Sequence, residues 1–293
     1  MMRPLSSGTD SMLRLSCLLA ALLLSTAPLA AEPVAQAKEK SAPSLSADPV
    51  NPDKPAQKPY LADETAPDTL AILPPPPGGH TAGESADRAV YNMTRAMVGT
   101  PRWDLATSDV AEGSEALLEN MSCVLARRLD PKRVPTLITM LDRARLDLVR
   151  AVRAPKRHYR RLRPFVGNEA PICVARDPHL SDSFSYPSGH ATQGWAYALI
   201  MASLLPEKAT PLLLRGRLYG ESRVVCGVHW MSDVVAGRTN ASIVVAALMG
   251  DAGFRADLDK ARAELKAALS GEGTMPDAAA CQREEVAARE TLP

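Results

Sequence analysis

Apolar residues recur at the spacing of an α-helix through most of the chain beyond residue 110. One series is Leu117, Met121, Val124 and Leu125, a second is Leu137, Leu141, Leu148 and Val152, and a third is Phe254, Leu258, Leu265 and Leu269. Such steps of three and four residues predict amphipathic helices. The segments 191–205 and 234–249 are apolar nearly all round, which predicts buried helices. Because no alternating strand pattern and no internal repeat is present, we expect an all-α fold: a single compact helical bundle domain with buried central helices.

Composition divides the 293-residue chain into four parts. Residues 1–31 resemble a secretory signal peptide, because two arginines precede an apolar run that ends in small residues and is too short for a comfortable membrane span. Residues 32–67 are rich in Pro, Ala, Ser and Lys, which predicts a flexible leader. Residues 68–270 carry the helical patterns and are long enough to bury a substantial core. We expect residues 271–293 to be a disordered tail.

The signal segment predicts export, and therefore a periplasmic or secreted protein. A membrane anchor retained at the N-terminus is the alternative. Export leaves four cysteines in an oxidising compartment, where disulfides form: Cys123, Cys173, Cys226 and Cys281. Four cysteines allow three pairings, and the sequence does not choose among them. Cys226 is also compatible with a buried free thiol.

The formal net charge is only +1, so no overall field favours a nucleic acid or an anionic membrane. Positive charge is local instead, because basic residues crowd the segment 150–163. A solvated helix face is the ordinary explanation for such a run. This run, however, ends in Arg163-Pro164, and a proline stops a helix and restricts the residue before it. The ending predicts a rigidly presented Arg163, with Lys156 able to reach the same point.

The segment 222–233 places an arginine, a histidine and a carboxylate at fixed offsets, as Arg223, His229 and Asp233. Four residues make about one helical turn, so His229 and Asp233 can face each other. A carboxylate partner fixes the tautomer and the ring orientation of a histidine. Arg223 adds a planar fork of donors that suits a tetrahedral oxyanion such as phosphate. A buried His–Asp pair beside a surface arginine is the alternative interpretation.

A second segment, 186–190, reads Tyr-Pro-Ser-Gly-His and precedes one of the apolar helices. Ser188 is a typical N-cap residue, and Gly189 allows a ligand to approach the backbone closely. The free N–H groups of a helix start bind anions, and His190 in the first turn would lie beside such an anion. The alternative is a capped buried helix that carries an incidental histidine.

Together, the three segments resemble the phosphatidic-acid-phosphatase type 2 superfamily, also called the vanadium-haloperoxidase-like superfamily. Its pattern is Lys-x6-Arg-Pro, then Pro-Ser-Gly-His, then Ser-Arg-x5-His-x3-Asp. The chain matches every fixed position: Lys156, Arg163, Pro164, Pro187, Ser188, Gly189, His190, Ser222, Arg223, His229 and Asp233. The stretches HYRRLRPF, SYPSGHATQGWA and GESRVVCGVHWMSDVVAGR, with LAILPPPPG upstream, are similar to the bacterial class A non-specific acid phosphatases. Arg157 departs from that branch, where an acidic residue is usual, and this puts the substrate preference in doubt.

The resemblance implies a metal-independent acid phosphatase that hydrolyses phosphate monoesters through a phosphohistidine, with broad specificity and an option of phosphate transfer to alcohols. In that scheme His229 is the nucleophile, Asp233 holds its ring, and His190 gives a proton to the leaving oxygen. The phosphate oxygens are bound by the other motif residues, which are Lys156, Arg163, Ser188, Gly189 and Arg223.

No cofactor and no metal are expected, because three cationic side chains take the place of a metal clamp. Phosphate or vanadate is expected as a pocket ligand or inhibitor. The expected partners are small phosphate monoesters. A nucleic acid is not expected as a dedicated partner, because no aromatic residues interleave the basic run. No stable membrane span is expected after signal removal. The sequence names neither the physiological substrate nor the oligomeric state, and a homodimer is an open alternative.

Three other functions share parts of this pattern. A vanadium haloperoxidase would use the same pocket, but such relatives are generally much longer. A lipid-phosphate phosphatase usually sits among membrane helices, whereas the apolar helices here are interrupted by Gln193, Arg238 and Asn240. A non-catalytic anion-binding protein would need the basic groups but not the His229–Asp233 pair.

Outside the motif, we expect structural or surface roles for the remaining candidates, which are Arg215, Arg217, His80, His158 and His179. We expect Trp230 to pack beside the pocket.

Overall fold

The computed structural model describes residues 57–290 and 292, and these form an all-α domain, as predicted. The expected signal peptide and most of the expected leader, residues 1–56, lie outside the described residues. The described part contains no strand. Its helices, in chain order, are α1 (Thr69–Ile72), α2 (Ala82–Arg95), α3 (Pro101–Ser108), α4 (Ser114–Asn120), α5 (Ser122–Leu125), α6 (Pro135–Tyr159), α7 (Pro178–Asp182), α8 (Gly189–Leu204), α9 (Ala209–Val225), α10 (Met231–Gly250), α11 (Ala252–Ser270) and α12 (Ala278–Arg289).

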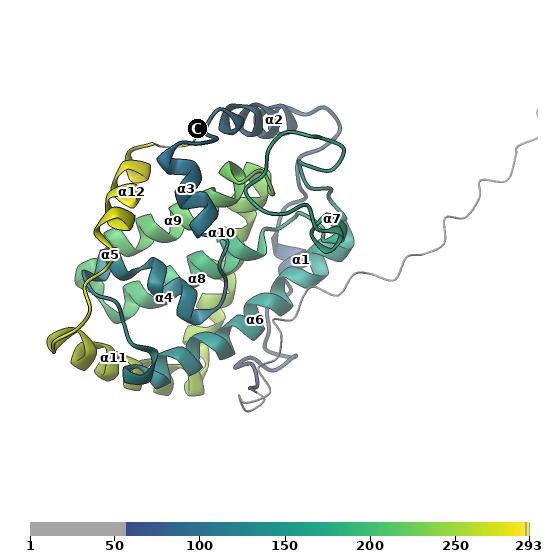
Figure 1. The fold of residues 1–293 in the computed structure, drawn as a ribbon. Helices are drawn as coiled ribbons and strands as arrows, with labels where there is room; N and C mark the ends of the chain where they lie inside the picture. Colours follow the sequence, from purple (N-terminus) through teal and green to yellow (C-terminus); the bar gives the residue numbers. More distant parts are fainter. Residues whose placement is uncertain (1–56, 291, 293) are drawn as a thin grey trace, which may run out of the picture. The chain divides into compact units, whose positions relative to one another are not determined.

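Helices α8, α9 and α10 lie together at the centre of the bundle, with α6 alongside (Figure 1). The contacts of α8 with α9 and α10 are the most extensive between any described helices. Helix α8 has no exposed residue, which confirms the prediction made from its apolar sequence. Helix α10 differs from that prediction, because an exposed stripe of Val235, Thr239, Ser242 and Ala246 runs along it and only its other faces are buried. The larger buried apolar cluster joins them to α6 and α11. A smaller cluster surrounds the end of α9 and the start of α10.

Two glycines allow the central helices to approach closely. A Cβ atom at Gly194 of α8 would lie 2.3 Å from the ring of Tyr219 on α9. A Cβ atom at Gly237 of α10 would lie 2.7 Å from the carbonyl oxygen of Ser188 and 3.0 Å from the Cβ of Ala191. Because only a hydrogen atom fits at these positions, the two contacts set the separation of the helices that carry the motif residues.

The end of α6 determines where the first two motif cations lie. The helix ends at Tyr159, and Arg160 then adopts a left-handed φ of 47°. Lys156 is therefore in the last turn, and its side chain projects from a rigid element. Arg163 lies in the loop that follows. Helix α6 therefore ends before the Arg163-Pro164 pair at which the sequence predicted that the proline would stop it.

The starts of α8 and α10 place the other motif residues. The hydroxyl of Ser188 accepts a hydrogen bond from the Ala191 N–H at 3.3 Å, which confirms the predicted N-cap. His229 lies just before Trp230, the N-cap residue of α10, and Asp233 lies in the first turn of this helix. The backbone N–H of Ser188 donates to the carbonyl oxygen of Asp233 at 3.0 Å, so the two helix starts are joined.

The domain extends beyond the predicted boundaries of 68 and 270. Tyr60 and Leu61, which we expected in the flexible leader, are buried, and their N–H groups donate to the Asp147 carboxylate at 2.9 and 3.3 Å. The expected disordered tail contains α12, which packs against α3 and α9 and is tied to α5 by the disulfide Cys123–Cys281. Both segments are poor in large apolar residues. Distant polar and covalent contacts order them, and local composition does not reveal such contacts.

A second disulfide, Cys173–Cys226, joins the loop before α7 to the end of α9. The alternative of a free thiol at Cys226 is therefore wrong. The pair lies within the smaller apolar cluster and also exchanges a backbone hydrogen bond, from the Cys173 N–H to the Cys226 carbonyl oxygen at 3.1 Å. The loop that follows Arg163 is thus fastened to α9 close to the third motif.

We predict that Gly237→Ala lowers the free energy of unfolding by about 1–3 kcal/mol, because the added methyl group would overlap the start of α8. Gly250→Ala lies on the same helix, and its Cβ would have nothing within 4 Å, so this variant is the matched control and should change stability little. Urea unfolding followed by circular dichroism measures both. Equal stability of Gly237→Ala and the wild type would contradict a tight contact between α8 and α10.

Candidate active site

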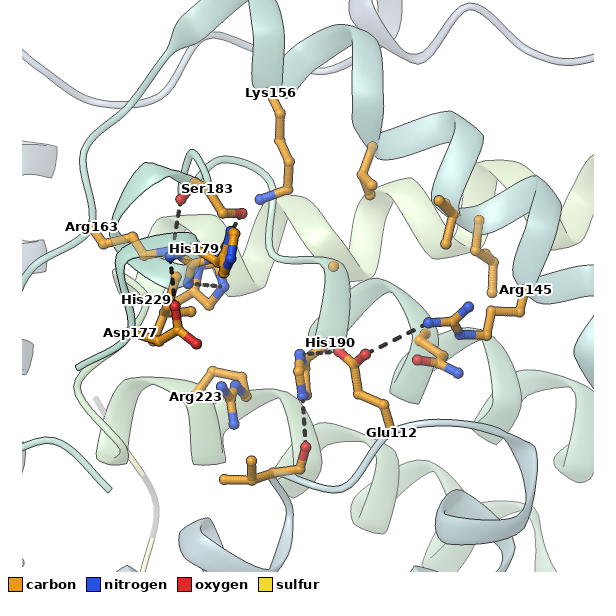
Figure 2. Close-up of a pocket in the computed structure, with 17 residues that line it drawn as sticks. Glu112, Arg145, Lys156, Arg163, Asp177, His179, Ser183, His190, Arg223 and His229 are labelled. Carbon is orange, nitrogen blue, oxygen red and sulfur yellow. Dashed lines mark hydrogen bonds and ion pairs between the residues drawn. The ribbon is translucent and has the colours of Figure 1, made fainter. Parts of the chain in front are cut away.

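The three predicted segments meet at one cavity of about 700 Å³. Six of the eight predicted site residues line it: Lys156, Arg163, Gly189, His190, Arg223 and His229. They come from α6, the loop after it, the start of α8, the end of α9 and the loop before α10, and they converge on the same space (Figure 2). The other two, Ser188 and Asp233, are buried behind this lining.

The imidazole of His229 is held in one tautomer. Nη1 of Arg163 lies 3.0 Å from its Nε2, and because a guanidinium only donates, Nε2 is the accepting nitrogen without a hydrogen. Nδ1 therefore carries the hydrogen, and it faces Oδ2 of Asp233 at 3.3 Å and Oγ of Ser185 at 3.2 Å. Burial and the charges of Arg163 and Lys156 hold the pKa of His229 well below its ordinary value. The ring is thus neutral, with its lone pair among the cations of the cavity.

The carboxylate of Asp233 is fully buried and accepts hydrogen bonds on both oxygens. Oδ2 accepts from the N–H of Trp230 at 2.8 Å and from the hydroxyl of Ser185 at 2.5 Å, in addition to the contact with His229. Oδ1 accepts from Nη1 of Arg161 at 2.6 Å. These donors fix the plane of the carboxylate, and the bond from Trp230 also satisfies an N–H group at the start of α10.

Arg161 is a residue of the site that the sequence analysis missed. Besides Asp233, it binds Oδ2 of Asp87 on α2 through Nη2 at 2.7 Å. Asp87 also accepts from the N–H of Ser232 at 2.9 Å. The guanidinium therefore links α2 to the start of α10 behind the catalytic candidates. In the sequence, nothing distinguishes Arg161 from its exposed neighbour Arg160, because both belong to the same basic run.

Three buried cations face the cavity, since Lys156, Arg163 and Arg223 are each at most 6% exposed. Burial and the adjacent charge of Arg163 lower the pKa of Lys156 to about 7. Nε and Nη1 of Arg223 have no hydrogen-bond partner in the part of the chain that the structure describes. Buried donors without acceptors are costly, so their position beside a cavity indicates a site for an anion with several acceptor oxygens.

A buried polar network supports the helix that carries Arg223. The preceding residue, Ser222, donates to Oδ2 of Asp109 at 2.6 Å, and Asp109 pairs with Arg215 at 2.5 Å. Arg215 also pairs with Glu284 of α12 at 3.0 Å. Burial opposes the charge on Arg215, but the carboxylates of Asp109 and Glu284 outweigh it and raise the pKa of Arg215. Arg215 therefore has the structural role that the sequence analysis expected.

His190 contacts the loop between α3 and α4. Its Nδ1 lies 2.6 Å from Oε1 of Glu112, and its Nε2 lies 3.1 Å from the carbonyl oxygen of Val110. Glu112 also pairs with Arg145 of α6 at 3.6 Å, and Figure 2 shows the three side chains in line. Burial would raise the pKa of Glu112, but the charge and hydrogen bond of His190 outweigh it and lower that pKa to about 2. Neither Glu112 nor Arg145 belongs to a motif, so the sequence analysis found neither.

Three further residues differ in their relation to the cavity. His179, which we expected outside the site, lines the cavity from α7. Trp230 is not among the lining residues, and its indole N–H donates to the carbonyl oxygen of Leu162 at 3.0 Å, so it packs beside the site as expected. Arg157 is exposed and does not line the cavity either.

The geometry has a definite chemical capacity. The neutral His229 presents a lone pair within a group of three cations, and a second histidine, His190, lines the same cavity. Such a site can bind a tetrahedral anion, attack its central atom and protonate a departing oxygen. The carboxylate of Asp233, behind the attacking ring, would stabilise the positive charge that forms on it.

Comparison with known proteins agrees with this geometry. Residues 146–255 match the family model described as the PAP2 superfamily. An acid phosphatase from Zymomonas mobilis is 41% identical over 221 residues, which cover 75% of this chain and 83% of the relative. Non-specific acid phosphatases from Salmonella typhimurium and Providencia stuartii are 35% and 38% identical over 210 residues, or 71% and 70% of this chain and 84% of each relative. With its motif residues gathered at one cavity, the chain therefore belongs to the PAP2 superfamily, among the bacterial acid phosphatases.

Proposed function

We propose that this phosphatase hydrolyses phosphate monoesters through a covalent phosphohistidine on His229. The observation that carries the proposal is the pair of partners around that ring, with the Asp233 carboxylate facing Nδ1 and the Arg163 guanidinium facing Nε2, which places the hydrogen on Nδ1 and the lone pair on Nε2. A histidine is nucleophilic only at an unprotonated nitrogen. Because the pKa of His229 is held well below its ordinary value, the ring remains a nucleophile in weakly acidic solution.

In the first step, Nε2 of His229 attacks phosphorus as the bond to the leaving oxygen breaks, and the electron pair of that bond stays on the leaving oxygen. Arg163 donates to Nε2 in the described state, so a phosphoryl oxygen has to take over this hydrogen bond before the attack. Lys156 and Arg223 bind the other phosphoryl oxygens, together with the N–H of Gly189 at the start of α8. His190 gives a proton to the leaving oxygen.

In the second step, water attacks the phosphohistidine and gives a proton to Nε2 of His190. The P–N bond breaks, and its electron pair returns to Nε2 of His229. An alcohol in the place of water would receive the phosphoryl group, so phosphate transfer follows from the same chemistry. Lys156, Arg163 and Arg223 neutralise the phosphoryl charge through both steps, which supports a mechanism without a metal ion.

Broad specificity and export are further parts of the proposal. One side of the cavity is formed by Leu148, Val149 and Val152 of α6, and this apolar stretch supports contact with varied leaving groups. The disulfides Cys123–Cys281 and Cys173–Cys226 support a periplasmic or secreted location, because disulfides persist in oxidising compartments.

Two findings bear on the alternatives that the sequence left open. None of the described helices is both long and apolar enough to cross a membrane. In the same part of the chain, no three His, Cys, Asp or Glu side chains are grouped so that they could hold a metal ion. Neither finding favours a second function over the phosphohistidine mechanism.

We predict that His229→Ala lowers the turnover of p-nitrophenyl phosphate by roughly 10³-fold or more, because the covalent nucleophile is lost. His179→Ala, which changes a cavity residue without a role in the chemistry, is the matched control and should keep most of the activity. Both are assayed at pH 5–7 with EDTA present. Equal turnover by His229→Ala and the wild type, or activity lost to EDTA and restored by a divalent metal, would contradict the mechanism.

The pKa of Lys156 predicts a pH dependence of anion binding. The ammonium form is present below a pKa of about 7 and is lost above it, so affinity for inorganic phosphate should fall as the pH rises through 7. Lys156→Gln should bind phosphate weakly throughout. The inhibition constant of phosphate is measured from pH 5 to 9 for the wild type and for Lys156→Gln. The ionisation of phosphate itself affects both proteins equally, so a difference between the two pH profiles reports the titration of Lys156. Parallel profiles would show that Lys156 does not titrate in this range.

Orthovanadate is expected to inhibit the enzyme in competition with substrate, because it offers the same oxygen geometry as phosphate. Arg223→Gln should weaken this inhibition by roughly 10- to 100-fold, since a buried hydrogen bond to a charged group is worth about 1.5–3 kcal/mol. Arg217→Gln is the control, because Arg217 pairs with Glu221 at 3.1 Å and does not line the cavity. Oxidation of bromide by peroxide after vanadate loading would instead favour a haloperoxidase.

A further inference from the structure

His190 is placed between two acceptors that hold a hydrogen on each ring nitrogen. Nδ1 faces the carboxylate of Glu112 at 2.6 Å, and Nε2 faces the carbonyl oxygen of Val110 at 3.1 Å. A carbonyl oxygen accepts and never donates, and the carboxyl group of Glu112, which also pairs with Arg145, is a carboxylate that does the same. A neutral imidazole has only one N–H group and could satisfy only one of them. The geometry therefore corresponds to an imidazolium, the form that a proton donor needs before the reaction.

The loop that supplies both acceptors is anchored residue by residue. Asp109 pairs with Arg215 at 2.5 Å, and the carbonyl oxygen of Ala111 accepts from the hydroxyl of Tyr219 at 2.9 Å. The ring of Tyr219 also stacks on His190, with ring centroids 6.0 Å apart and planes inclined by 21°. Glu112 pairs with Arg145 on its other side. The loop is thus a fixed element that presents its acceptors to His190.

Glu112 is the carboxylate that contacts His190, whereas the other groups facing the ring are neutral or cationic. These groups are Gln193 of its own helix, Arg145 and Lys156 of α6, Tyr219 and Arg223 of α9, and His229. The other lining carboxylate, Asp177, accepts from the His179 N–H at 2.7 Å as the cap of α7. Among the described residues around His190, Glu112 thus supplies the negative charge against the ring.

We propose that Glu112 is a positioning residue that keeps His190 protonated and directs its Nε2–H towards the leaving oxygen. The proposal rests on the phosphohistidine mechanism. As the bond from phosphorus to the leaving oxygen breaks, the Nε2 proton moves to that oxygen, Val110 loses its hydrogen bond, and Glu112 retains the Nδ1–H. In the second step, Nε2 recovers a proton from the attacking water. Glu112 thus never loses or gains a proton itself.

The proposal predicts an effect that depends on the leaving group. p-Nitrophenolate departs without protonation, whereas an alkoxide requires it, so only alkyl phosphates need the proton of His190. The quantity to measure is kcat/KM, because it reports the steps up to the phosphohistidine. For Glu112→Gln, kcat/KM with glycerol 1-phosphate should fall roughly tenfold or more. This loss would be part of the ~10²–10⁴-fold rate enhancement that proton donation contributes. With p-nitrophenyl phosphate, kcat/KM should change less than about threefold.

Two further variants complete the test. Glu112→Asp keeps the carboxylate and should recover part of the loss, and it serves as the test variant if Glu112→Gln does not fold. Glu119→Gln removes an exposed ion pair with Arg128 outside the cavity and should leave both substrates unaffected. Equal losses of kcat/KM on the two substrates, or no loss on either, would overturn the proposal for Glu112. Activity that survives His229→Ala would instead overturn the phosphohistidine mechanism, so the two failures are distinguishable.

Discussion

The buried carboxylate of Asp233 is the interaction on which the rest of the site depends. Its Oδ2 receives the Nδ1–H of His229 and thereby leaves the lone pair on Nε2. The same carboxylate accepts from Trp230 at the start of α10, and the backbone carbonyl of Asp233 accepts from Ser188 at the start of α8. One residue therefore orients the ring of His229 and joins the two helix starts. Arg161 compensates the buried charge of Asp233. The contact between the two helix starts and the charge balance of the site therefore depend on the same residue.

The two histidines of the cavity have different neighbours. His229 lies among buried cations that favour the neutral ring, and its carboxylate partner is shared with Arg161. His190 has a carboxylate on one nitrogen and a carbonyl oxygen on the other, which matches the charged ring. Different environments around two like groups are what the proposed division into a nucleophile and a proton donor requires. Arg223, which lines the same cavity, has two buried donors without a partner among the described residues, and these donors suit an anion with acceptor oxygens.

The motif spacings were sufficient to predict the centre of the site, and local geometry explains why. His229 and Asp233 are one helical turn apart, Ser188 caps the helix that begins beside His190, and Lys156 belongs to the last turn of α6. Each of these relations is short in sequence and follows from helix periodicity or capping. The apolar segments around 191–205 and 234–249 predicted central helices for the same reason, since helices apolar on every face have to be buried.

The residues that complete the site depend on contacts between distant segments. Asp87 reaches Arg161 from α2, and Glu112 reaches His190 from the loop before α4, yet neither occupies a position with a recognisable spacing. The ordering of α12 likewise depends on a disulfide to α5 that four cysteines alone could not identify. The sequence by itself determined the fold class, the family and the central motif residues, because these follow from periodicity and local spacing. Only the tertiary structure decided which charges surround each histidine, because burial and charge pairing arise when remote elements pack together.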